Sequence, residues 1–247
     1  VELALITLKG EMGYPSCLTA PVWGFYDVSF KGKSFSFQRD YGSYVMGNVL
    51  FKLSFPAEFH AQTAVECAVI LHDEIKDRLD EIASIELTTH ESAIRIISKQ
   101  GKLHNYADRD HCLQYMVAIG LLFGDLKAEH YEDSIACDPR IDTLRDKMLV
   151  QENKSYSDDY HAIDKRSIAN AMQIIFKDGT KTQKVAIEYP IGHKNRRAEG
   201  VKVLNEKFAR NLSTHYGHSQ TSKIIQACHS LEDLKAMDVS SFIDLWL

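Results

Sequence analysis

The sequence has few cysteines, and none is spaced like a ligand of a metal site. No two of them show the CxxC or Cys/His spacing of a zinc or iron–sulfur site. Because their number is odd and they are widely separated, a framework of disulfides is not indicated. We therefore expect small, buried or partly buried thiols in a reducing cytoplasm, and no metal ion or cluster as cofactor. The five residues are Cys17, Cys67, Cys112, Cys137 and Cys228.

Long apolar runs, low-complexity tracts and a strong excess of one charge are also absent. No run approaches the ~20 apolar residues that a membrane-spanning helix needs. The formal net charge of −5 argues against a general nucleic-acid binder. The 247 residues are 45% hydrophobic and 26% charged, which suits a globular protein of one or two domains. We expect neither a membrane nor a nucleic acid among its partners.

Strand patterns are present in the middle of the chain. Residues 84–89 alternate apolar and polar side chains, which predicts a half-buried strand. Residues 168–176 and 182–189 flank Asp178-Gly179, a dipeptide that favours a tight hairpin turn. These patterns predict an antiparallel sheet. Residues 25–37, FYDVSFKGKSFSF, alternate aromatic and polar side chains and fit either a short hairpin or a loop.

Helical patterns surround these strands. After Pro56, which suits a first helical turn, apolar residues recur at three- and four-residue steps from Ala61 to Ile75. A second buried helix is expected after Asp108, a candidate N-cap, and short helices around 128–135 and 139–148. Both ends of the chain also have helical patterns. The fold class is therefore α+β, with an antiparallel sheet packed against helices.

The start of the helix after Pro56 is the leading candidate site. Lys52 precedes it, and Glu58, His60 and Gln62 fall in its opening turns, where backbone N–H groups favour an anion. These residue types suit the binding of a polycarboxylate, with Lys52 and His60 as catalytic candidates and Tyr44 as a further substrate contact. Three alternatives stay open: a solvated Lys52, a His60 bonded to a carbonyl, and a Glu58 that only favours the helix dipole.

A second candidate cluster lies in KLHNYADRDHCLQY. Asn105 and Arg109 are substrate-binding candidates, and His111 is a catalytic candidate. Tyr115 lies four residues after His111, so the two would share one face of a helix and point into a pocket. The alternative for Arg109 is an ion pair with a nearby acid.

Two further groups of polar residues follow predicted strands. His90 and Arg95, in THESAIRII, are substrate-binding candidates at a strand end. The basic turn IGHKNRR carries His193, Arg196 and Arg197, and is interpreted as a solvated loop.

Several of these stretches carry a family resemblance. They are FKLSFPAEFHAQTAVECA, LTAPVWGFYDVSFKGKSFSFQRDYGSYVMGNVL, ADRDHCLQYMVAIGLLFG, YEDSIACDPRIDTLRDKM and EYPIGHKNRR. Together they closely resemble the MmgE/PrpD family over nearly the whole chain. The resemblance implies a hydro-lyase that dehydrates 2-methylcitrate to 2-methyl-cis-aconitate in propionate breakdown, with citrate as a further candidate substrate, and without an iron–sulfur cluster.

The resemblance also implies a domain organisation. Residues 1–51 would end a helical domain and connect it to an α+β lid domain at 52–195. Residues 196–247 would return to pack on the helical domain. The sequence opens within a helical pattern and without an initiator Met, so we expect a C-terminal part that lacks most of the N-terminal helical domain. This part alone would be inactive, and the enzyme would be a cytoplasmic homodimer.

Two other interpretations remain. A related family activity, such as decarboxylation of cis-aconitate, would use a similar carboxylate-holding site. A catalytically inactive C-terminal half could instead act as an interaction module.

Overall fold

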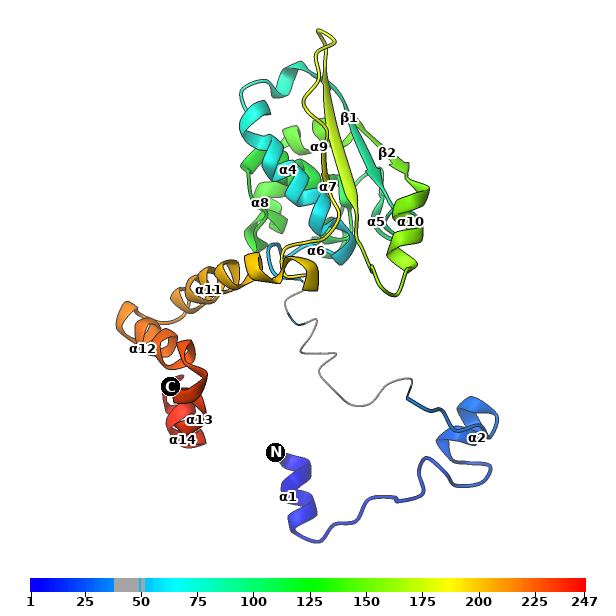
Figure 1. Ribbon diagram of the computed structural model, residues 1–247, viewed down its shortest axis with the longest axis vertical. Coiled ribbons are helices and arrows are strands. Elements are labelled where there is room, and N and C mark those ends of the chain that lie inside the picture. The colour runs from blue at the N-terminus through cyan, green and yellow to red at the C-terminus, as the bar shows by residue number, and fades with distance from the viewer. Residues whose placement is uncertain (38–48, 50–51) are drawn as a thin grey trace. The chain divides into compact units, whose positions relative to one another are not determined.

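The computed structural model describes residues 1–37, 49 and 52–247 (Figure 1). The chain divides into two compact units, Val1–Val45 and Met46–Leu247. The second unit holds a four-stranded sheet and the helices that cover it, which confirms the α+β class. In the described part of the chain, no helix combines the length and apolar character needed to cross a membrane.

The sheet of the second unit has the strand order β2-β1-β3-β4. Strand β1 pairs antiparallel with β3, and β3 pairs antiparallel with β4, as the sequence predicts. Strand β2 pairs parallel with β1, so the sheet is mixed at one edge. This strand was not predicted, and its parallel pairing requires the long helical crossover between the two strands. The strands are β1 (Ile82–Thr89), β2 (Met148–Glu152), β3 (Asn170–Phe176) and β4 (Val185–Ile187).

The predicted hairpin joins β3 to β4. Gly179 adopts a φ of +83° and its N–H donates to the carbonyl of Phe176 over 3.0 Å. Beyond the turn, Thr182 donates its N–H to the carbonyl of Ile174 and accepts the Ile174 N–H on its side-chain oxygen, both over 3.0 Å. Because this hydroxyl takes the place of a backbone carbonyl, regular pairing resumes only at Val185. Strand β4 is therefore shorter than its predicted range.

The hydrophobic core lies between the sheet and two helices. Helix α4 (Gln62–Ile75) packs against β3, β4 and helix α7 (Leu113–Phe123) (Figure 1). Helix α7 is buried on all sides from Leu113 to Leu122, as expected for a helix inside a core. A Cβ atom at Gly120 would lie 2.8 Å from the Cβ of Ala68. The absence of a side chain at Gly120 therefore permits the close approach of α7 to α4.

The helix starts differ from the sequence expectations in two places. The segment after Pro56 begins with a 3₁₀ turn, η1 (Phe59–Ala61), so Pro56 precedes the helix. The carbonyl of Pro56 accepts a hydrogen bond from the hydroxyl of Tyr131 over 2.9 Å. Asp108 does not cap the second buried helix. It lies within a short helix, α6 (Tyr106–Asp110), which the side chain of Asn105 caps.

The remaining helices of the second unit are short, apart from α11 and α12. Helix α9 begins at Pro139, as predicted. Helix α10, which follows β2, was not predicted. The set comprises η2 (Leu79–Glu81), α5 (Glu91–Ile97), η3 (Ala128–Tyr131), α8 (Asp133–Ala136), α9 (Pro139–Arg145), α10 (Lys154–His161), η4 (Lys194–Arg196), α11 (Arg197–Ser213), α12 (His218–His229), α13 (Leu231–Ala236) and α14 (Val239–Asp244).

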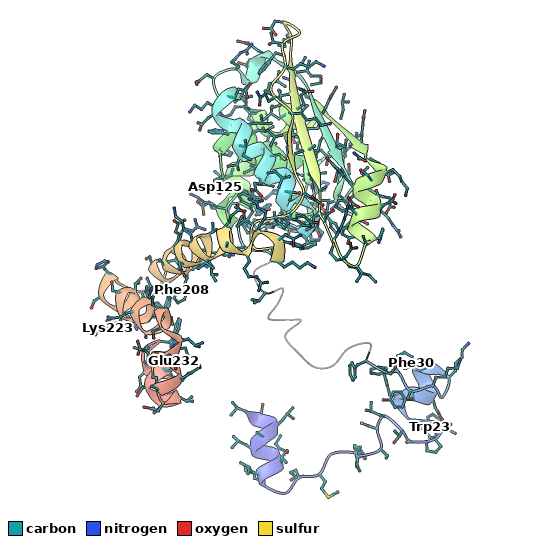
Figure 2. The ribbon with its side chains drawn as sticks, in the orientation of Figure 1. Trp23, Phe30, Asp125, Phe208, Lys223 and Glu232 are labelled. Carbon is teal, nitrogen blue, oxygen red and sulfur yellow. The ribbon has the colours of Figure 1, made fainter. Side chains whose placement is uncertain are left out.

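The first unit contains the short helices α1 (Glu2–Leu8) and α2 (Phe25–Phe30). Helix α2 occupies the start of the stretch expected to be a hairpin or loop, and ends at Lys31 with a φ of 55°. Trp23 and Phe30, labelled in Figure 2, are 85% and 41% exposed. No apolar side chain is buried among residues 1–37 of this unit, so this part of it has no hydrophobic core of its own.

The contact between α4 and α7 predicts the effect of substituting Gly120. Gly120→Ala should lower the free energy of unfolding by ~1–3 kcal/mol, because the new methyl group meets Ala68 although alanine favours helix. Urea unfolding of the chain measures the change. Combining it with Ala68→Gly should cost less than the sum of the two single changes. Strict additivity would show that the two positions do not touch.

Candidate functional site

The start of α4 is organised by one carboxylate. Glu58 accepts the backbone N–H of His60 over 2.8 Å and caps the 3₁₀ turn. Its other oxygen lies 2.9 Å from Nδ1 of the His60 ring. The anion expected at this helix start is therefore Glu58 itself. Burial raises the pKa of Glu58, but the hydrogen bonds and charge of His60 outweigh it, and the pKa lies below its usual value.

A tyrosine contacts the other ring nitrogen of His60. The hydroxyl of Tyr160, on α10, lies 3.1 Å from Nε2 of His60. The ring of His90 stacks on Tyr160 with centroids 4.7 Å apart and lies 5.2 Å from the ring of His60. We call Glu58, His60, His90 and Tyr160 the His60 cluster. Two of the sequence-predicted substrate contacts and one predicted catalytic residue are thus brought together by the fold.

The backbone around the cluster is held by hydrogen bonds between distant segments. His90 follows β1 and precedes α5, where the N–H of Glu91 donates to Oγ of Ser157 on α10 over 2.9 Å. Helix α10 lies next to α5 (Figure 1). Asn170, at the start of β3, donates its amide to the carbonyl of His60 over 3.0 Å. Segments that are far apart in the sequence therefore fix the cluster's geometry.

The members of the His60 cluster differ in how far they are buried. His90 is fully buried and His60 is 7% exposed, whereas Tyr160 is only half-buried. Burial, with a smaller effect of His60, lowers the pKa of His90 to about 4, so its ring is neutral near neutral pH. Neither ring nitrogen of His90 has a hydrogen-bond partner in the described part of the chain. A neutral ring always carries one N–H, and leaving it unpaired costs ~1–3 kcal/mol.

The other candidates near this helix have different positions. The amide of Gln62 donates to the carbonyls of Phe55 and Ala57 over 3.0 and 2.9 Å, which holds the preceding loop. Lys52 is exposed, and no contact joins it to the His60 cluster among the described residues. Tyr44 lies outside the described residues.

Two residues of the second predicted cluster serve the interior of the fold. Arg109 is buried and donates to the carbonyl of Tyr131 and to the carboxylate of Asp133, so it has the ion pair that the sequence left open. Tyr115 is buried, and its hydroxyl donates to the carbonyl of His130 over 2.6 Å. Burial raises the pKa of Tyr115 to about 12.

The remaining predicted residues lie at the surface. His111 is half exposed, 2.6 Å from Asp110, and precedes α7, so it shares no helix face with Tyr115. Asn105 accepts the N–H of Asp108 as the cap of α6. Arg95, on α5, is exposed. The structure does not add these residues to the His60 cluster.

The basic turn is not a solvated loop. His193 is 1% exposed, and its ring stacks on Tyr189 with centroids 4.4 Å apart. Burial and the nearby positive charges lower the pKa of His193 to about 4. Arg196 forms ion pairs with Glu66 on α4 and with Glu199. This turn therefore fixes the start of α11 on α4.

Metal ligands are not gathered in the described part of the chain. There, no group of three His, Cys, Asp or Glu side chains is placed to hold a metal ion. Cys67 and Cys112 are buried in the core, and Cys17 and Cys137 are exposed.

A sequence profile of the MmgE/PrpD C-terminal domain matches residues 55–233, most of the chain. The chain belongs to the MmgE/PrpD family. The matched range begins just before Glu58 and includes every member of the His60 cluster.

Curated MmgE/PrpD proteins align with the whole chain. It is 58% identical to the mitochondrial 2-methylcitrate dehydratase of Yarrowia lipolytica, of which it covers 48%. It is 54% identical to the 2-methylcitrate dehydratase of Escherichia coli K12 and covers 52% of that protein. A probable 2-methylcitrate dehydratase of Saccharomyces cerevisiae is 50% identical and 49% covered. The chain thus spans about half the length of the curated relatives it matches.

The contacts of Arg109 predict a structural effect of its removal. Arg109→Ala should lower the free energy of unfolding by ~1–3 kcal/mol, because the carbonyl of Tyr131 loses a buried donor. Arg95→Ala, at an exposed position, should change it by less than ~0.5 kcal/mol. Chemical denaturation compares the two variants. Equal effects would contradict the assignment of Arg109 to the interior.

The burial of His90 predicts a loss of stability in acid. Its pKa is about 4 in the folded protein and ~6.5 when unfolded, so the unfolded state binds more protons between these values. Stability should therefore fall as the pH drops through 6.5, by up to ~3 kcal/mol at pH 4. His90→Phe should weaken this pH dependence and leave only the part due to His193. His104→Gln, at an exposed position, should leave the pH dependence unchanged. An unchanged pH dependence in His90→Phe would refute this origin.

Proposed function

We propose that the chain is the C-terminal part of a hydro-lyase that dehydrates 2-methylcitrate to 2-methyl-cis-aconitate in propionate catabolism. The observation that carries the proposal is the identity of 50–58% over the whole chain to proteins named 2-methylcitrate dehydratase or probable 2-methylcitrate dehydratase. The His60 cluster supports it chemically. Citrate, which shares the tertiary alcohol and three carboxylates, is proposed as a further substrate.

The reaction needs a group that takes a proton from carbon and a group that gives one to the departing hydroxide. Histidine suits both tasks near neutral pH. The carboxylate of Glu58 lies 2.9 Å from Nδ1 of His60 and orients its ring, so the pair is placed to hold and release a proton. We propose His60 as the central acid–base residue of this chain, supported by Glu58.

The substrate carboxylates need cations. Lys52 and Arg95 are exposed and therefore accessible to a ligand, whereas Arg109 is already paired with Asp133. We propose Lys52 as a carboxylate contact, with further contacts from the half of the family's chain that is not represented here. His111, half exposed beside Asp110, stays a second-rank candidate.

We propose that the site is completed by that other half. Residues 52–195 would form the lid, while 1–51 and 196–247 would pack with the family's N-terminal helical domain. Exposed apolar residues support this arrangement, including Val201 at 51% and Leu204 at 37% on α11. Such surfaces usually mark an interaction site when they are contiguous.

A homodimer is proposed for the complete protein. Its compartment stays a prediction, since one relative is named as mitochondrial.

The dehydration is proposed to proceed without a metal ion or iron–sulfur cluster held by this chain. The support lies in the positions of its cysteines, two of which are in the core and two at the surface.

A second candidate function, an inactive interaction module, is favoured only by the exposed apolar side chains and the half-length match.

The test is to assay the chain with and without the other half of the family's sequence, supplied in one polypeptide or by co-expression. The chain alone should be inactive, and the combination should convert 2-methylcitrate, measured by the ultraviolet absorbance of the new double bond. His60→Gln should lower turnover by ~10²–10⁴-fold with an unchanged melting temperature. His161→Gln, at an exposed position, is the matched control.

Other outcomes separate the alternatives. Decarboxylation of cis-aconitate without dehydration would favour the related family activity. Binding of the other half without turnover of either substrate would favour the interaction module. Activity of the chain alone would show that its pocket is complete, and loss of activity on chelation, restored by iron and sulfide, would contradict cluster-free catalysis.

A further inference from the structure

Tyr160 and Glu58 are the two half-buried members of the His60 cluster, and Tyr160 is the one that carries a hydroxyl group. His90 is fully buried and His60 is 7% exposed, but Tyr160 is half-buried. A substrate that approaches the cluster from solvent therefore has better access to Tyr160 than to His60. The hydroxyl is also in direct contact with Nε2 of His60, at 3.1 Å.

The hydrogen bonds define a direction for proton transfer. An ionised Glu58 only accepts hydrogen bonds, so Nδ1 of His60 carries the hydrogen of the 2.9 Å contact. Nε2 of the neutral ring is then an acceptor, and the Tyr160 hydroxyl donates to it. This order, carboxylate to imidazole to hydroxyl, is the arrangement in which a histidine activates a hydroxyl group.

We propose that Tyr160 is a further catalytic residue, whose hydroxyl exchanges the proton between His60 and the substrate. The proposal rests on the proposed dehydratase function and adds the group that touches the reacting carbon. It assigns His60 and Glu58 the role of activating Tyr160.

The proposed step balances within the cluster and the substrate. The Tyr160 oxygen takes the proton from the carbon next to a carboxylate while its own proton moves to Nε2 of His60. The electron pair of the C–H bond forms the double bond as the C–O bond breaks. The departing hydroxide then takes up one proton, which Tyr160 delivers and replaces with the proton held on His60. Water leaves, and the cluster returns to its initial protonation state.

The surroundings of Tyr160 support this role. Stacking on His90, with an interplanar angle of 13°, fixes the plane of the phenol ring. Burial lowers the pKa of His90 to about 4, so its ring is neutral near neutral pH and adds no positive charge beside the His60 ring, whose centroid is 5.2 Å away. Helix α10 is anchored separately by Asn153, which caps it, and by Ser157, which binds the backbone of Glu91. The Tyr160 hydroxyl is therefore not needed to hold the helix.

The kinetic test uses the complete protein with Tyr160→Phe, and Tyr156→Phe on the same helix as a matched control. Tyr160→Phe should lower kcat by ~10²–10⁴-fold, change KM only a few-fold and leave the melting temperature unchanged. Tyr156→Phe should retain wild-type kcat. A wild-type kcat in Tyr160→Phe, or a large fall in melting temperature that accounts for the lost activity, would overturn the proposal.

A spectroscopic test on the chain itself does not depend on activity. In ¹⁵N NMR of the imidazole nitrogens, His60 should show hydrogen on Nδ1 and a hydrogen-bonded Nε2 acceptor. Tyr160→Phe should shift the Nε2 resonance, and Tyr156→Phe should not. Hydrogen on Nε2 in the wild type would overturn the relay. If the complete wild-type protein does not dehydrate 2-methylcitrate, the proposed function fails and the catalytic role with it, even where the NMR shows the hydrogen bond.

Discussion

The geometry around His60 depends on one carboxylate that has two tasks. Glu58 accepts the backbone N–H of His60, which starts the 3₁₀ turn before α4, and it also binds Nδ1 of the same residue's ring. The backbone conformation and the orientation of the imidazole are therefore set by the same group. An exposed acid at a helix start would stabilise the helix to a similar degree, but it would not fix which ring nitrogen is free to accept a proton.

Two other predicted site residues show why residue type alone was a poor guide to the site. Gln62 and Arg109 have the chemistry of ligand-binding residues, yet both donate to backbone carbonyls, Gln62 to Phe55 in the preceding loop and Arg109 to Tyr131 in η3. Buried carbonyls require donors, and long polar side chains supply them where no strand or helix is available. The function of such a residue is decided by what the fold places beside it.

Local patterns predicted much of the fold. The alternation in β1, the hairpin around Asp178-Gly179 and the helix start at Pro139 follow from short-range chemistry, and the structure contains all three. Strand β2 was missed because its five residues have no clear alternation, and its pairing partner lies far away in the sequence. Tyr160 was missed for the same reason. Nothing in the local sequence distinguishes Tyr160 from its neighbours Tyr156 and His161 as a site residue. Only the tertiary structure brings Tyr160 to His60.

The distance along the chain between His60 and Tyr160 has a consequence for biosynthesis. One hundred residues separate the two partners, and α10 follows β2, the strand that closes the parallel edge of the sheet. Contacts of such long range form slowly, because a large loop must close before they are made. As the chain leaves the ribosome, Glu58 and His60 emerge well before the segment that brings Tyr160. Until that segment is synthesised, Glu58 and His60 lack the contact with Tyr160 and are accessible to solvent and to chaperones.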